Sequence, residues 1–121
     1  MSEAPAWPGT LEVFWSWHME AACRRVDGTL FFSPEGERGR HKERREAAAK
    51  QVCGLCKVVE LCAAYAIATR EPYGTWGGLS ETDRRELVRQ VDPRLAQVRY
   101  RRELAAWEQT TAWSRPEADR D

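Results

Sequence analysis

Residues 53–62 read Cys-Gly-Leu-Cys-Lys-Val-Val-Glu-Leu-Cys, which places Cys53, Cys56 and Cys62 in a C-x2-C-x5-C pattern. The one other cysteine of the chain, Cys23, precedes them. Four thiols match the ligand number of a four-coordinate metal centre or of a cubane iron-sulfur cluster. We therefore expect the four cysteines to form one site that organises the fold around itself.

Spacing alone leaves three kinds of thiol chemistry open. Structural zinc commonly uses two C-x2-C pairs, and this chain has only one. An iron-sulfur cluster tolerates the uneven spacing because each iron takes one thiolate, and redox-active thiols are the third reading. A disulfide framework would need an oxidising compartment. Residues 1–20 lack the basic and apolar regions of a secretory signal, so we expect a cytoplasmic protein with reduced thiols.

Length and composition indicate one small domain with a thin core. The chain has 121 residues, 31% of them charged, and only three phenylalanines. A centre that joins four thiolates would then be needed for folding as well as for function. No run of eighteen apolar residues indicates a membrane span. The 19 basic and 19 acidic residues cancel, so a nucleic-acid role must rest on local clusters of charge.

The first half of the chain predicts a mobile lead and three helices. Residues 1–9 contain Pro5, Pro8 and Gly9 and should form the lead. Thr10 should cap a first helix whose apolar face delivers Cys23 at its end; that face comprises Leu11, Phe14, Trp15, His18 and Ala22. Residues 31–40 should form a loop, residues 43–52 a helix that leads into Cys53, and residues 58–70 a helix that carries Cys62.

The second half predicts a glycine-rich turn and two further helices. Residues 74–78 read Gly-Thr-Trp-Gly-Gly, a sequence that favours a tight turn projecting Trp76. Ser80 and Asp83 resemble a capping box, and Asp92 with Pro93 should begin a last helix that ends near Gln109 and frays from Thr110. The expected fold is all-α, a bundle of four to five helices, three of them around the cysteine site.

The cysteine spacing together with the turn at residues 74–78 resembles the WhiB-like family of actinobacterial regulators. The resemblance covers about residues 12–90, so residues 10–91 would form the iron-sulfur domain and residues 92–121 a C-terminal helix and frayed tail. Phe31-Phe32 with the following Pro-Glu-Gly-Glu-Arg-Gly-Arg segment, and residues 71–81, also resemble the subgroup that binds the primary sigma factor. Thr75 and Lys57 depart from the family pattern, which more often has an aliphatic residue and a proline there.

The resemblance implies a regulator of transcription that responds to redox state or nitric oxide. One 4Fe-4S cluster per chain would be ligated by Cys23, Cys53, Cys56 and Cys62. The protein would dock on region 4 of the primary sigma factor of RNA polymerase, with the interface or cluster lid formed by Gly74, Thr75, Trp76, Gly77, Gly78, Phe31 and Phe32. The family also implies disulfide pairing, DNA binding and protein-disulfide reductase activity for the cluster-free form. A dedicated enzyme, a small-molecule substrate and a membrane partner are not expected.

Two of these features also have an ordinary structural interpretation. Trp76 could be an ordinary core aromatic, which is the commoner fate of tryptophan. Residues 84–102 hold seven arginines against Glu86 and Asp92, which could form a solvated helix face or meet DNA phosphates without reading bases. The expected phosphate contacts are Arg94, Arg99, Arg101 and Arg102. A zinc-stapled DNA-binding module remains the alternative to the iron-sulfur reading.

Overall fold

The computed structural model describes residues 11–114, and side chains over residues 12–110. Over that range the chain forms five α-helices: α1 (Leu11–His18), α2 (Gly39–Gly54), α3 (Val59–Thr69), α4 (Glu81–Gln90) and α5 (Pro93–Ser114). Two short 3-10 helices, η1 (Ala22–Arg25) and η2 (Gly28–Phe31), lie between α1 and α2. The one β-type pairing within residues 11–114 is an isolated bridge between Trp76 and Leu79. The prediction of a small all-α fold is confirmed.

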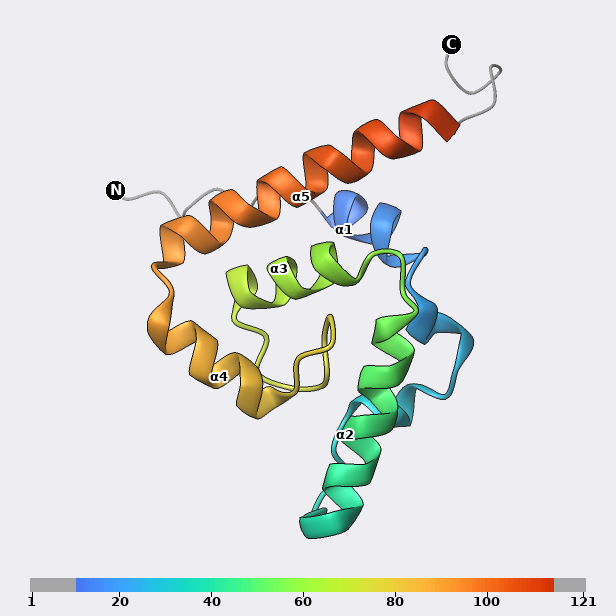
Figure 1. The fold of residues 1–121 in the computed structure, drawn as a ribbon, viewed down its shortest axis with the longest axis vertical. Helices are drawn as coiled ribbons and strands as arrows, with labels where there is room; N and C mark the ends of the chain where they lie inside the picture. The colour runs from blue at the N-terminus through green and yellow to red at the C-terminus, as the bar shows by residue number, and fades with distance from the viewer. Residues whose placement is uncertain (1–10, 115–121) are drawn as a thin grey trace.

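Helix α3 lies at the centre of the molecule and packs most extensively against α5, which runs along one side (Figure 1). Helix α2 extends away on the opposite side, with η1 and η2 against it. Helix α4 and the turn before it complete the body next to α3. No helix within the described residues is long and apolar enough to cross a membrane.

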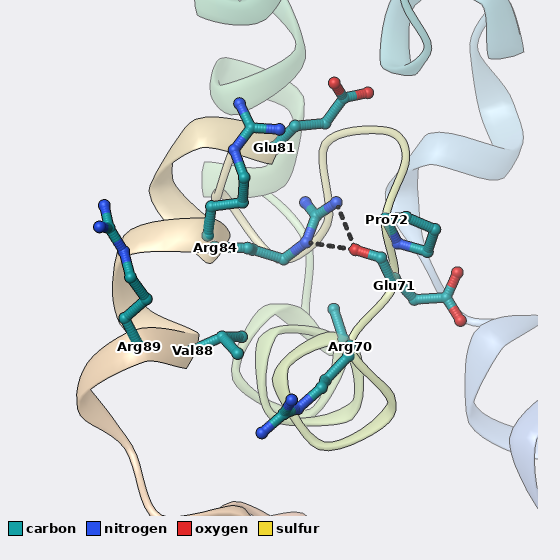
Figure 2. A pocket seen from close by; sticks show the side chains of 9 residues that line it. Arg70, Glu71, Pro72, Glu81, Arg84, Val88 and Arg89 are labelled. Atoms are coloured by element: carbon teal, nitrogen blue, oxygen red, sulfur yellow. Dashed lines mark hydrogen bonds between the residues drawn. The ribbon is translucent and has the colours of Figure 1, made fainter.

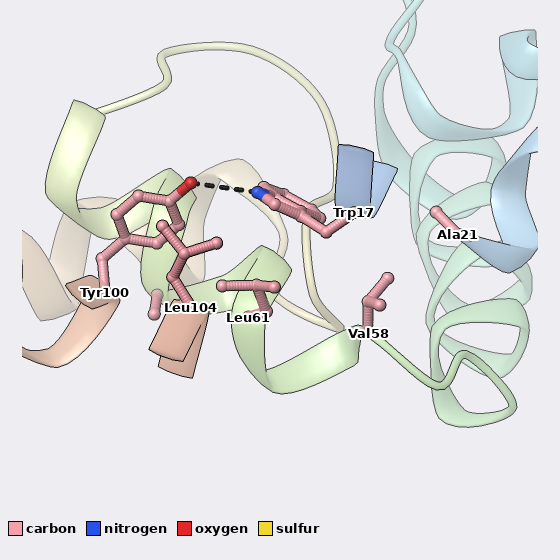
Figure 3. Close-up of a cluster of buried hydrophobic side chains, with 7 residues drawn as sticks. Trp17, Ala21, Val58, Leu61, Tyr100 and Leu104 are labelled. Atoms are coloured by element: carbon pink, nitrogen blue, oxygen red, sulfur yellow. Dashed lines mark hydrogen bonds between the residues drawn. The ribbon is translucent and has the colours of Figure 1, made fainter. Parts of the chain in front are cut away.

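The main core joins α1, α3 and α5 through few large side chains. Trp17 is fully buried, and its indole Nε1–H donates a 3.0 Å hydrogen bond to the hydroxyl of Tyr100 (Figure 3). The cluster around this pair also contains Ala21, Val58, Leu61, Ala64 and Leu104. A second, smaller cluster comprises Phe31, Ala49 and Cys53. Both clusters rely on alanines and aromatic rings, as expected for a thin core.

The predicted helix starts are confirmed at α4 and α5. The Ser80 hydroxyl accepts from the Asp83 backbone N–H, while the Asp83 carboxylate accepts from the Ser80 N–H. The Asp92 carboxylate accepts from the backbone N–H of Arg94 at 2.8 Å. These side chains satisfy backbone donors that have no partner inside the helix, which fixes where each helix begins.

Several predicted helix limits are wrong. Helix α1 ends at His18 and does not reach Cys23, because i to i+3 hydrogen bonds tighten the chain after it and Ala21 takes an extended conformation. Helix α2 begins at Gly39, four residues before the expected start, and α5 continues past Gln109 to Ser114. The predicted lead at residues 1–9 and the end of the predicted tail, residues 115–121, lie outside the described residues.

The predicted apolar faces also need correction. Among residues 12–18 of α1 the buried residue is Trp17, whereas Trp15 is 44% exposed. On α5 the apolar spacing marks Leu95, Val98 and Leu104, but over residues 93–110 the buried residues are Ala96, Tyr100 and Leu104, while Leu95 and Val98 are exposed. The sequence pattern identified the helices but selected the wrong side chains for part of the core, because the tyrosine and alanines that fill it carry a weak hydrophobic signal.

Candidate metal centre

The four cysteines line one small cavity between the first half of the chain and α3. Cys23 comes from η1, Cys53 from the end of α2, Cys56 from the turn after it, and Cys62 from α3. The other residues around the cavity are Ala21, Phe31, Val52, Val59, Thr75 and Gly77. All four thiols are free, with no disulfide between them. The structure therefore brings together the four side chains that the sequence predicted to form one site.

The thiols influence one another's protonation. Burial raises the pKa of Cys62, and the neighbouring sulfurs of Cys53, Cys23 and Cys56 raise it further. The pKa of Cys23 is raised by burial and then by Cys56 and Cys53, and burial also raises the pKa of Cys53. Deprotonation of this set is therefore unfavourable unless a cationic centre balances the negative charge.

Backbone N–H groups point at several of the sulfurs. The N–H of Ala22 donates to the Cys56 sulfur at 3.4 Å. Hydrogen bonds from the backbone of Gly78 and Gly77 lower the pKa of Cys53 and of Cys62, opposing the effect of burial. Hydrogen bonds to ligand sulfurs are among the features that tune iron-sulfur centres. The donor set and its surroundings thus fit a cluster held by four thiolates.

The arrangement does not resemble a compact site for one ion. Within the described residues, no group of three or more His, Cys, Asp or Glu side chains converges in a way that could hold a single metal ion. A cluster places a different requirement on the protein, because each of its irons takes its own thiolate.

The glycine-rich turn packs directly against the cysteine cavity. Gly74, Gly77 and Gly78 all have positive φ, as the sequence predicted for a tight turn. A Cβ atom at Gly77 would lie 2.3 Å from the backbone nitrogen of Ala63 on α3, so only glycine allows this approach. The Thr75 N–H donates to the Phe31 carbonyl at 2.8 Å, and the Gly74 N–H donates to the Glu81 carboxylate at 2.7 Å. The turn therefore contacts three other segments: α3 by close packing, and η2 and α4 by hydrogen bonds.

Trp76 at the tip of this turn is half-buried among other rings. Its ring stacks on Tyr65 with 5.8 Å between centroids and an interplanar angle of 29°. The ring centroids of Phe14 and His18 lie 6.5 and 6.2 Å from that of Trp76. The Trp76 Nε1–H donates to the Tyr73 carbonyl at 2.9 Å. Trp76 is thus part of an aromatic cluster, as a core residue would be. Its side chain is nevertheless partly exposed. The helical spacing over residues 58–70 places Tyr65 on the same side as Leu61 and Cys62, but nothing in the sequence indicates its contact with Trp76.

A larger hollow, of about 520 Å³, opens beside the cysteine cavity; we call it the aromatic hollow. Its walls are Phe14, Trp15, His18, Cys23, Arg24, Val26, Gly28, Phe31, Phe32, Cys62, Thr75 and Trp76. Phe31 is buried between the two spaces, whereas Phe32 is 49% exposed. Cys23, Phe31, Cys62 and Thr75 line both the cavity and the hollow. The residues predicted as ligands and those predicted as an interface are therefore contiguous.

The arginines predicted to contact DNA lie on α5 and line neither the cysteine cavity nor the aromatic hollow. Arg94, Arg101 and Arg102 are exposed, and Arg99 makes an exposed ion pair with Glu60 at 3.3 Å. Arg84, in the same basic stretch, is instead buried and donates to backbone carbonyls. Its burial could not be read from the sequence, because its acceptors come from a turn that only the fold brings close.

Comparison of the sequence with known proteins identifies its relatives. The model of the family described as transcription factor WhiB matches residues 17–87. The chain is 50% identical over 95 residues to the transcriptional regulator WhiD of Streptomyces coelicolor, covering 78% of this chain and 85% of WhiD. It is 48% identical over 82 residues to the redox-responsive transcriptional regulator WhiB3 of Mycolicibacterium smegmatis, covering 68% and 85%. The transcriptional regulator WhiB1 of Bifidobacterium longum is 47% identical over 75 residues, covering 62% and 79%.

Proposed function

The chain belongs to the family of WhiB transcription factors, and from that premise we propose that Cys23, Cys53, Cys56 and Cys62 hold one 4Fe-4S cluster beside a docking surface for region 4 of the primary sigma factor. Family membership makes the protein a regulator of transcription, and a relative is named as redox-responsive. When bound, such a cluster supplies a redox-active centre that oxygen and nitric oxide can attack.

One observation carries the proposal: the cysteine cavity and the aromatic hollow share Cys23, Phe31, Cys62 and Thr75. Ligation would hold Cys23 on η1 and Cys62 on α3 at a fixed separation, and both residues are walls of the hollow. Release of the sulfurs would leave η1 without that link to α3. Ligand binding and the shape of the docking surface are therefore coupled through the same side chains.

The hollow has the composition of a protein interface. Exposed Trp15, Phe32 and half-buried Trp76 offer large aromatic surface around a concave centre, and aromatic anchors of this kind dominate the energy of protein contacts. The hydrogen bonds that tie the turn to Phe31 and Glu81 hold Trp76 in position. We assign this surface to the sigma factor, which would place the protein in the cytoplasm with RNA polymerase.

DNA contact is the second part of the proposal. Arg94, Arg101 and Arg102 are exposed on α5 and would meet phosphates rather than base edges. Such contacts would weaken steeply with salt and show little sequence preference. A complex with the sigma factor would supply the promoter specificity that these arginines lack.

The reductase alternative receives little support from the thiols. The pKa values of Cys23, Cys53 and Cys62 are all raised, so few of these groups would be thiolates near neutral pH. Attack on a disulfide requires the thiolate. Cys53 also lies in the last turn of α2 and Cys56 just after that helix, whereas a thioredoxin-like C-x2-C motif follows a strand. A zinc-stapled module would be recognised by colourless anaerobic protein that retains zinc.

Anaerobic co-purification with the sigma-factor C-terminal domain tests the docking surface. We expect Trp76→Ala to keep its iron and to bind at least about tenfold more weakly, because an aromatic anchor is lost. Leu55→Ala is the control, because Leu55 is 87% exposed and lines neither the cavity nor the hollow. Equal binding by an iron-loaded Trp76→Ala variant would contradict this placement of the interface.

A further inference from the structure

A separate cleft of about 380 Å³ lies between α4 and the segment that follows α3 (Figure 2). It contains none of the cysteines and none of the residues of the aromatic hollow. We call it the arginine cleft, and its lining residues are Ala66, Arg70, Glu71, Pro72, Glu81, Arg84, Arg85, Val88 and Arg89. Four arginines face two glutamates, so this part of a neutral chain carries a local excess of positive charge.

Arg84 forms the rigid back of the cleft. It is 2% exposed, and its guanidinium donates to the carbonyl oxygens of Leu79 at 2.8 Å, Glu71 at 3.1 Å and Tyr73 at 3.2 Å. Figure 2 shows it reaching from α4 to the backbone of Glu71. Carbonyl oxygens hold this charge in place, and Glu81 and Glu71 offset part of it, so the excess of positive charge at the cleft comes from the other three arginines.

The other three arginines form an accessible rim. Arg70, Arg85 and Arg89 are exposed, and the guanidinium groups of Arg70 and Arg89 point away from the Arg84 contact (Figure 2). Arg85 donates to the Thr82 hydroxyl at 3.3 Å, and Arg89 makes an exposed pair with Glu86. Exposed pairs of that kind are weak and are easily exchanged for a better partner.

The two acidic residues of the cleft already have partners. The Glu81 carboxylate accepts from the Gly74 N–H at 2.7 Å, and the Glu71 carboxylate accepts from the Thr69 hydroxyl at 3.3 Å. The rim arginines come from two elements, the end of α3 and α4, so they surround the opening instead of forming one row. Carboxylates from outside would meet a cationic rim.

The apolar part of the lining comprises Ala66, Pro72 and Val88, and we call it the floor. Tyr73, next in the chain to Pro72, is 70% exposed. Arginine and tyrosine are enriched among the residues that dominate protein interfaces. A DNA backbone would use the rim but gain nothing from an apolar floor, whereas an acidic peptide with one apolar side chain would use both.

We propose that the arginine cleft binds an acidic segment of another protein, with an apolar side chain on the floor and flanking carboxylates on Arg70, Arg85 and Arg89. This second docking surface is separate from the cysteine cavity, because the two share no lining residue. The protein could then bind an acidic partner at the arginine cleft while the sigma factor occupies the aromatic hollow.

The test uses the full, anaerobically purified chain and a fluorescein-labelled twelve-residue peptide with one central leucine flanked by aspartates and glutamates. We expect saturable binding by fluorescence anisotropy that weakens with salt and falls at least about tenfold when Arg70→Glu and Arg89→Glu are combined. Replacement of the peptide leucine by serine should also weaken binding, because the floor would lose its contact. Arg101→Glu on α5 is the matched charge control and should bind as wild type does.

Three results would overturn the proposal. One is the absence of saturable binding at millimolar peptide, and another is equal binding by the Arg70→Glu/Arg89→Glu variant with unchanged circular dichroism. The third is binding that does not change when the peptide leucine is replaced, together with displacement of the peptide by a duplex oligonucleotide. This result would mean that the rim binds nucleic acid. Iron content and sigma-factor binding of each variant are measured in parallel, so failure of this cleft is distinguishable from failure of the cysteine site.

Discussion

The indole Nε1–H of Trp17 donates a 3.0 Å hydrogen bond to the hydroxyl of Tyr100, 83 residues further along the chain. Both side chains are almost wholly buried, at 0% and 2% exposure. Burial raises the pKa of the Tyr100 hydroxyl, and the hydrogen bond from Trp17 opposes that change. The contact fastens α5 to α1, the helix before the first cysteine, so the C-terminal helix supports the site from a distance.

Tyr100→Phe tests this contact, because it leaves the buried indole N–H without an acceptor. We expect the free energy of unfolding to fall by about 1–3 kcal/mol. The double variant with Trp17→Phe should cost less than the sum of the single variants, with a coupling of roughly 0.5–3 kcal/mol. Anaerobic urea denaturation followed by circular dichroism measures all three; strictly additive effects would show that the bond contributes nothing.

Gly77→Ala should disrupt the turn through a clash as well as through strain. The new Cβ would lie 2.3 Å from the Ala63 nitrogen, at a residue with φ of +58°. Gly36→Ala is the control, because Gly36 also has positive φ but has no atom within 4 Å of the added carbon. We expect Gly77→Ala to cost about 1–3 kcal/mol more than Gly36→Ala and to reduce iron retention. Equal costs would mean that backbone strain alone explains the glycine.

His18 should make stability depend on pH. Burial lowers the pKa of His18 below its usual 6.5, and Arg24 lowers it further; its Nδ1 atom is buried and has no hydrogen-bond partner among the described residues. Because the unfolded chain binds this proton more readily, stability is full above about pH 6.5 and is lost as the pH falls towards the folded value. Unfolding measured from pH 5 to 8 should show this slope. The slope should flatten in His18→Phe, and an unchanged slope would exclude His18 as its source.

Arg84→Met should destabilise the protein strongly. It would leave the carbonyl oxygens of Leu79, Glu71 and Tyr73 without their charged donor, in a buried place. We expect a loss of roughly 2–5 kcal/mol. Arg85→Met, at the exposed neighbour, should stay within about 0.5 kcal/mol of wild type. Similar losses at both positions in thermal unfolding would show that Arg84 acts as an ordinary surface arginine.

Local patterns in the sequence predicted a large part of this structure. The capping residues Ser80 and Asp92, the glycine turn around Trp76 and the gathering of the four cysteines all depend on short-range chemistry or on residue types with narrow uses. The helical spacing of apolar residues also placed α3 and α4 correctly.

The remaining features depend on contacts that only the fold creates. Helix α1 ends at His18 because the chain must turn to place Cys23 beside α2 and α3. No residue pattern within residues 11–23 indicates that turn. Trp17 is central because Tyr100 meets it from α5. Arg84 reads as a charge on a solvated helix face until the loop carbonyls are brought to it.

The central claim is that a cluster held by four thiols gives this chain both its fold and its response. Cooperative unfolding of the anaerobic protein, measured before and after its iron is removed, tests this claim most directly. We expect about four irons and four sulfides per chain, and we expect the cooperative transition to be lost when they are removed. Iron-free protein that unfolds with an unchanged cooperative transition and still binds the sigma-factor domain would contradict it.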